Sequence, residues 1–259
     1  GGPALLVLPG VLSAAAMATA WARRHQGRKL AHLLDARSTS VAELLDLQRT
    51  VAEQMGAGSF AERVKLCGQI VCEDPLIAPW SGEPCVAFDD SETELVEVYR
   101  ETTSTDADGR SSREGSWQRD DQVLSQLERR CAFVLRQGGN SLPVNPEGAD
   151  LELETVVDTT DRSRSSGGLG DFGARRRSLG VRRVERILRA SGSLFVVAQC
   201  SDSDGVLHLQ APDQGGLFVM RRGSEQTYSR GLRRWRRIWT VSTWTLAALA
   251  VLLLLAAVL

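Results

Sequence analysis

Two long stretches without a charged side chain, one near each end of the chain, constrain the fold most strongly. The first covers residues 3–22 and the second residues 238–259 of the 259-residue sequence. At about 1.5 Å rise per residue, a helix of either length crosses a hydrocarbon core about 30 Å thick. Arginines and tryptophans border both stretches, as they do at membrane surfaces. The sequence therefore predicts two transmembrane helices and an integral, two-pass membrane protein.

A cleaved signal peptide is the alternative for the first stretch. Such a peptide carries its positive charge ahead of the apolar run, and the opening GGPALL has none. Both basic flanks lie on the side of the intervening residues. In a bacterial inner membrane this would place those residues in the cytoplasm, but the rule is a poor guide in an organelle's outer membrane. The topology therefore depends on which membrane holds the protein.

Residues 23–58 are predicted to form a helical segment beside the membrane. Ser40 and Glu43 have the spacing of a capping box at the start of a helix. Apolar side chains then recur at helical spacing, and Gly56 marks the end. Residues 59–229 are predicted to form one β-rich soluble domain. The expected fold class is α+β, with a β-rich, membrane-adjacent domain flanked by two transmembrane helices.

Alternation of apolar and polar side chains predicts strands within the β-rich domain. The clearest pattern lies at residues 64–72, and a hairpin is expected from 194–200 and 206–209. Further strands are predicted at 85–88, 95–102, 131–135, 150–157 and 217–220. The polar stretches 104–115 and 158–178 are expected to be loops. In residues 179–190 the apolar side chains fall at helical spacing with arginines opposite, which predicts a helix.

No pattern in the sequence points to an active site, a metal site or a bound cofactor. The five cysteines and three histidines show no zinc-binding spacing, and the cysteines are expected to be buried apolar side chains. Asp89 and Asp90 would point to opposite faces of a strand, and His208 is expected to be structural. The glycine-rich stretch 167–173 lacks the residues of a phosphate-binding loop. We therefore expect no catalytic, cofactor-binding or metal-binding residue.

Arginines form the densest charge cluster between the two apolar stretches. Three interpretations are open: a solvated helix face, a surface for anionic lipid headgroups or an acidic partner, and a nucleic-acid site. Nucleic acid is the least favoured, because aromatic side chains are not interleaved and Glu185 interrupts the run. The residues predicted to contact lipid or a partner are Arg175, Arg176, Arg177, Arg182, Arg183, Arg186, Arg189, Arg233, Arg234, Arg236 and Arg237.

Three short motifs, in order along the chain, resemble the GIDE domain, also called the beside-a-membrane domain. This domain belongs to RING-type E3 ubiquitin ligases in the outer membranes of mitochondria and chloroplasts. The matching residues are Phe133, Leu135, Gly138, Val144, Pro146, Gly148 and Ala149 in the first motif, Gly180, Arg183 and Glu185 in the second, and Leu209, Pro212, Gly215 and Phe218 in the third. Gly148 and Gly180 suit turns or helix boundaries, and Glu185 is expected to pair with a neighbouring arginine.

The resemblance implies a role in a RING-type ubiquitin ligase without implying a catalytic residue here. Family ligases carry a RING after the second membrane helix, and its zinc ligands are not found in this sequence. The expected function is the membrane-anchored substrate-recognition or scaffold portion of an outer-envelope E3 ubiquitin ligase-like protein whose RING is not in this chain. The alternative is a RING-less, non-enzymatic membrane scaffold or lipid- or partner-binding module, as in bacterial members.

The expected location and partners follow from the same resemblance. A chloroplast or mitochondrial outer envelope is favoured, with a bacterial inner membrane as the alternative. The expected partners are the lipid bilayer and other membrane proteins, which would be substrates or members of a complex. No cofactor is expected. A soluble hydrolase or transferase is the least favoured class, because no acid, base and nucleophile converge in the sequence.

Overall fold

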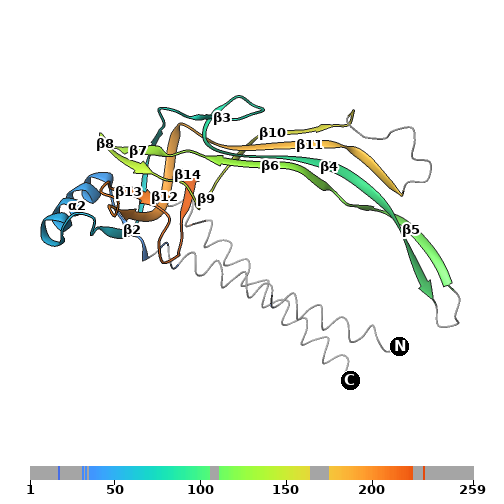
Figure 1. Ribbon diagram of the computed structural model, residues 1–259, viewed down its shortest axis with the longest axis horizontal. Coiled ribbons are helices and arrows are strands. Elements are labelled where there is room, and N and C mark those ends of the chain that lie inside the picture. Colours follow the sequence, from blue (N-terminus) through green and yellow to red (C-terminus); the bar gives the residue numbers. More distant parts are fainter. Residues whose placement is uncertain are drawn as a thin grey trace, which may run out of the picture. The chain divides into compact units, whose positions relative to one another are not determined.

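The computed structural model describes residues 35–105, 111–163 and 175–223, together with Met17, Ala31, Leu33 and Arg230. In this described part, the elements with defined ends are fourteen strands and one helix, α2 (Figure 1). The chain divides into two compact units. The described residues within 1–71, 134–151 and 192–259 form the ring unit, and those within 72–133 and 152–191 form the ribbon unit.

The ring unit is built on one sheet that closes on itself. The strand order is β1-β2-β7-β8-β13-β12-β14-β9, and β2 also pairs with β12, so that β2, β7, β8, β13 and β12 complete a ring. The elements are β1 (Arg37–Ser38), α2 (Val41–Met55), β2 (Ala61–Val71), β7 (Phe133–Gln137), β8 (Asn140–Val144), β9 (Asp150–Leu151), β12 (Gly192–Ser201), β13 (His208–Gln210) and β14 (Val219–Arg222).

Apolar side chains fill the ring because every strand alternates between its inner and outer face. Five of these side chains are fully buried, so this unit has a core of its own: Val64, Leu135, Leu142, Val196 and Leu209. The crossing of β2 and β7 is tight. A Cβ atom on Gly68 would lie 2.6 Å from the side chain of Leu135 and 2.9 Å from a backbone oxygen of β7, so only glycine fits there.

Helix α2 begins and ends where the sequence predicts. Ser40 Oγ accepts the backbone N–H of Glu43 at 3.2 Å, and the Glu43 carboxylate accepts the backbone N–H of Ser40 at 3.2 Å. This confirms the capping box. Gly56, with φ of 95°, ends the helix. Val41 and Leu44 are the fully buried side chains of its apolar face.

Asp202, just after β12, fastens the chain that follows α2 to the ring. One carboxylate oxygen accepts the backbone N–H of Phe60 at 2.8 Å, and the other accepts the side-chain amide of Gln48 at 2.9 Å. Asp202 is only 2% exposed. Burial acts to raise the pKa of this carboxyl, but the hydrogen bonds from Gln48 and from backbone N–H groups lower it below the ordinary value.

The ribbon unit is a long, antiparallel sheet around one central strand. The strand β4 pairs with β11 along one side and with β6 and then β5 along the other, and β10 pairs with the far side of β11 (Figure 1). The strands are β3 (Leu76–Ile77), β4 (Pro84–Thr105), β5 (Ser111–Arg119), β6 (Gln122–Arg130), β10 (Glu154–Asp161) and β11 (Arg176–Arg189). A small apolar cluster of Ala78, Cys85, Phe88 and Ile187 lies near the start of β4.

The expected α+β class with two flanking transmembrane helices is wrong. Strands dominate the described residues, and no helix in that part of the chain is both long and apolar enough to cross a membrane. Apart from Met17, the segments 3–22 and 238–259 lie outside the described residues. The boundaries at 23–58 and 59–229 stay predictions.

Most strands predicted from alternation are confirmed, including 64–72, the hairpin of β12 and β13, and the short β14. The helix predicted at 179–190 is wrong, because residues 179–189 lie in β11. Charged side chains recur along β11, so the sequence of this strand does not show the simple two-residue period that predicts a strand. The loop predicted at 104–115 is also wrong where it is described, since β4 reaches Thr105 and β5 begins at Ser111.

Candidate functional site

The arginines that the sequence singles out lie on or beside β11 and face acidic side chains on neighbouring strands. All seven described members of the cluster make an ion pair within the ribbon unit. The pairs join Arg175 to Glu101, Arg176 to Glu94, Arg177 to Glu97, Arg182 to Asp158, Arg183 to Glu92, Arg186 to Asp89, and Arg189 to both Glu83 and Glu154.

The pair between Arg182 and Asp158 is bidentate, with Nε and one terminal nitrogen donating to the two carboxylate oxygens at 2.8 and 2.7 Å. The hydrogen bonds from Arg182 lower the pKa of the Asp158 carboxyl. Such pairs cancel charge on the ribbon face and leave less attraction for anionic lipid than the sequence suggests. Lipid or partner contact by these arginines stays a prediction. Arg233, Arg234, Arg236 and Arg237 lie outside the described residues.

Glu185 has a different role from the arginines around it. Its side chain is 0% exposed, and its two carboxylate oxygens accept the backbone N–H groups of Trp80 at 2.7 Å and Ser81 at 3.0 Å. It thus holds the loop between β3 and β4 against β11. Glu185 was expected to pair with a neighbouring arginine, but its carboxylate binds these two backbone N–H groups. The guanidinium of Arg183 lies 5.9 Å from the centre of the Trp80 ring and adds a cation–π contact.

A second buried carboxylate, Asp90, lies opposite Glu185 in the register of β4 and β11. It is 6% exposed and accepts the backbone N–H of Leu127, on β6, at 3.1 Å. Burial raises the pKa of the Asp90 carboxyl, against the lowering effect of that hydrogen bond, and the nearby charges of Glu185 and Asp89 raise it further. Asp90 and Glu185 therefore fix β6 and the β3–β4 loop to the central strands.

The strand β6 presents apolar side chains to solvent at the edge of the sheet. Val123 is 65% exposed, Leu124 53% and Leu127 48%. Among the described strands, β6 pairs only with β4, and a register shift near Thr93 interrupts that pairing. Edge strands of this kind present backbone donors and acceptors to a further strand. We call residues 122–130 the β6 edge.

Sequence reasoning missed the β6 edge. Eight of its nine residues are exposed, so neither face shows the buried stripe on which strand prediction depends. The available signal was a short group of apolar residues, Val123, Leu124 and Leu127, between the charged stretches 119–121 and 128–130. Exposed apolar side chains that gather in one patch are typical of binding surfaces.

Near the far end of β4, an aromatic pair joins β4 to β5. The rings of Tyr99 and Trp117 meet edge to face with centroids 5.4 Å apart, and the guanidinium of Arg177 lies 4.3 Å from the centre of the Trp117 ring. A Cβ atom on Gly115 would lie 1.8 Å from the Tyr99 hydroxyl, so glycine leaves room for that ring. This cluster supports the strand pair and holds no reactive group.

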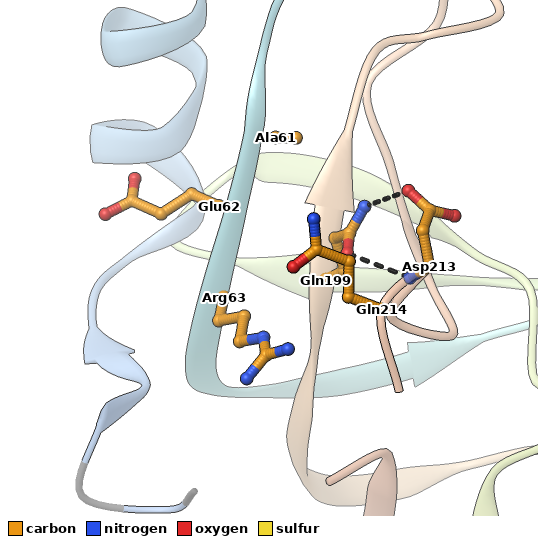
Figure 2. Close-up of a pocket in the computed structure, with 6 residues that line it drawn as sticks. All are labelled: Ala61, Glu62, Arg63, Gln199, Asp213 and Gln214. Carbon is orange, nitrogen blue, oxygen red and sulfur yellow. Dashed lines mark hydrogen bonds between the residues drawn. The ribbon is translucent and has the colours of Figure 1, made fainter. Parts of the chain in front are cut away.

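A polar pocket of about 250 Å³ lies in the ring unit and is drawn in Figure 2. Gln199 and Asp213 face each other there with two hydrogen bonds, of 2.7 and 3.2 Å. Arg63 donates to the carbonyl of Gly215 at 2.8 Å. The turn from Pro212 to Gly215 belongs to the third motif, so that motif shapes a turn.

The described residues show no cluster for metal binding. No group of three or more His, Cys, Asp or Glu side chains in the described part could hold a metal ion. Both ring nitrogens of His208 have partners, the carbonyl of Val206 and the side chain of Gln210, each at 2.8 Å. Two of the five cysteines, Cys85 and Cys200, are buried as expected, and the other three are partly exposed.

Comparison with known proteins gives one finding. The family model of the GIDE domain, described as an E3 ubiquitin ligase, matches residues 101–256, which is more than half of the chain. The search of curated proteins gives no match, and neither does the search of solved structures.

Proposed function

Because the chain belongs to the GIDE family of E3 ubiquitin ligases, we propose that it is the substrate-recognition and scaffold portion of an E3 ubiquitin ligase-like protein whose RING lies outside these residues. The β6 edge is the observation that supports this proposal. A ligase acts on other proteins, so its recognition surface must bind polypeptide. A strand that is paired along one side only, among the described strands, and that carries exposed apolar side chains has the chemistry for that task.

The bound segment in this proposal is an extended stretch of a substrate protein that pairs with β6 as an additional strand. Backbone hydrogen bonds would supply much of the affinity, and the side chains of Val123, Leu124 and Leu127 would contribute the apolar contacts. Arg130 and Glu128 make an ion pair at one end of the edge. The other end lies beside Asp120 and Asp121. These charges limit the apolar region to the middle of β6.

Two substitutions test the β6 edge without touching the core. Val123→Asp combined with Leu124→Asp places two charges where a partner strand would pack, and the wild-type side chains are 65% and 53% exposed. Burial of an unpaired charge in an interface is costly, so we expect at least a tenfold loss of ubiquitination on sites that depend on this protein. Quantitative mass spectrometry of ubiquitin-modified peptides, in cells complemented with the full-length protein, measures it.

Val206→Asp is the matched control, because Val206 is 57% exposed and lies in the ring unit. It introduces one of the two added charges on a valine about as exposed as Val123. We expect ubiquitination to be unchanged by this variant. Equal losses from both variants, or no loss from the β6 double variant at normal protein levels, would contradict recognition by the β6 edge.

We also propose that the protein works attached to a membrane, in an organelle outer envelope in preference to a bacterial inner membrane. The support is the pair of uncharged stretches at 3–22 and 238–259, which carry basic flanks. Its partners would then be the bilayer and neighbouring membrane proteins. The full-length protein is expected to stay in the membrane pellet after washing with alkaline carbonate. Complete release into the supernatant would contradict attachment.

A further inference from the structure

Two of the partly exposed cysteines lie side by side where the first segment of the ribbon unit begins and ends. The sulfur atoms of Cys72 and Cys131 are 3.9 Å apart. Cys72 is the first residue of the segment 72–133, directly after β2, and Cys131 directly follows β6 near the end of that segment. The backbone N–H of Cys131 donates to the carbonyl of Val86 at 2.9 Å, which fixes its position beside β4.

We propose that Cys72 and Cys131 form a reversible disulfide, which closes the segment carrying β3, β4, β5 and β6 into a loop. A disulfide needs its sulfur atoms about 2.05 Å apart, so rotation of the two side chains must bring them about 2 Å closer. This inference goes beyond the proposed recognition function and does not depend on it. It rests on the distance between the two thiols, their partial exposure and their place at the two ends of one segment.

The three other cysteines differ from this pair in their surroundings. Cys85 and Cys200 are fully buried, and burial raises the pKa of their thiols to about 11 and about 12. Such thiols form little of the reactive thiolate at neutral pH. Cys67 packs against the buried cluster of Phe195 and Val197 in the ring unit. Only Cys72 and Cys131 thus combine exposure with a second sulfur atom at contact distance.

Oxidation by a small disulfide such as oxidised glutathione balances the reaction. The thiolate of one cysteine attacks the glutathione disulfide, forms a mixed disulfide and releases one glutathione as a thiol. The thiolate of the other cysteine then attacks the protein sulfur of the mixed disulfide and releases the second glutathione. Two protein thiols lose two electrons and two protons, and one glutathione disulfide becomes two thiols. Reduced glutathione at higher concentration reverses both steps.

The expected rate of the reaction rises with pH. Burial raises the pKa of the Cys131 thiol, although a hydrogen bond with the backbone at Leu76 acts to lower it, and the neighbouring Cys72 raises it further. More of this thiol is ionised as the pH approaches its pKa. Disulfide formation should therefore be several-fold faster at pH 8.5 than at pH 7.

The experiment uses the full-length protein in buffers of reduced and oxidised glutathione, followed by alkylation, digestion and mass spectrometry. We expect a linked peptide pair containing Cys72 and Cys131, two mass units lighter than the reduced pair, which disappears on addition of excess reduced glutathione. The variant Cys131→Ser should instead retain glutathione on Cys72. The control Cys67→Ser should leave the linked pair unchanged.

A physical readout accompanies the chemical one. Because cross-linking constrains the unfolded segment, we expect oxidation to raise the melting temperature by several degrees in the wild type and not in Cys131→Ser. Persistent thiols at a tenfold excess of oxidised glutathione overturn the proposal. So does a stable glutathione adduct on wild-type Cys72, or a linkage through Cys85. Each of these outcomes concerns the ribbon unit's thiols alone and leaves recognition by the β6 edge unaffected.

Discussion

Replacing Glu185 by alanine is expected to lower the free energy of unfolding of the ribbon unit by about 3 kcal/mol. The carboxylate is fully buried and accepts the backbone N–H groups of Trp80 and Ser81. Alanine leaves both donors without an acceptor, and each buried, unsatisfied group costs about 1–3 kcal/mol. The loss is partly offset because a buried charge is removed. Hydrogen exchange of the β4 and β11 amides measures it.

Two further variants serve as comparisons for Glu185→Ala. Glu185→Gln keeps one acceptor oxygen and turns the other into a donor, so its loss should lie between wild type and alanine. Asp158→Ala removes an exposed partner of Arg182 and should change exchange little. Exchange rates in Glu185→Ala that match those of Asp158→Ala would show that the two N–H contacts contribute nothing to stability.

The second large effect is expected in the ring unit, at Asp202. Alanine at this position should lower the free energy of unfolding by about 3 kcal/mol, because the N–H of Phe60 and the amide of Gln48 lose their acceptor in a buried place. Chemical denaturation of the full-length protein, followed through exchange of β2 and β12 amides, measures the change. Asp204→Ala is the control in the same turn, since the Asp204 side chain is 65% exposed, and it should cost no more than about 1 kcal/mol.

The contribution of Asp202 should depend on pH. The pKa of this carboxyl is lowered in the folded protein, so its stabilising effect is complete above the ordinary aspartate value of 3.8 and is lost as the pH falls through the folded pKa. The difference between wild type and Asp202→Asn should therefore be largest at neutral pH and shrink in acid below pH 3.8. A difference that grows on acidification would contradict the assigned hydrogen bonds.

Local signals in the sequence were enough for the parts of the fold that depend on near neighbours. The capping box of Ser40 and Glu43 spans three residues, so the start of α2 could be predicted from sequence alone. The alternation in β2 similarly reflects one buried face of one strand. In both cases the residues that decide the structure lie next to each other in the chain.

The ribbon unit could not be predicted in this way. Glu185 meets Trp80 across 105 residues of sequence, and Cys72 meets Cys131 across 59. Such contacts depend on the pairing of β4 with β11 and β6, which no local pattern encodes. Residues 179–190 have helical spacing when read alone. The acidic side chains of β4 and β10 that pair with the β11 arginines are far away in the sequence, so the sheet is not visible there. The family resemblance was confirmed, whereas these roles emerged only from the fold.

The most direct measurement of substrate recognition is site-specific cross-linking from the β6 edge. A photoactivatable amino acid replaces Leu124 in the full-length protein, and the same amino acid replaces Val206 in a parallel sample as a control of similar exposure. We predict that the probe at Leu124 cross-links the proteins whose ubiquitination requires this protein and that the probe at Val206 does not. Cross-links from Val206 alone, with those same proteins still ubiquitinated, would contradict recognition through β6.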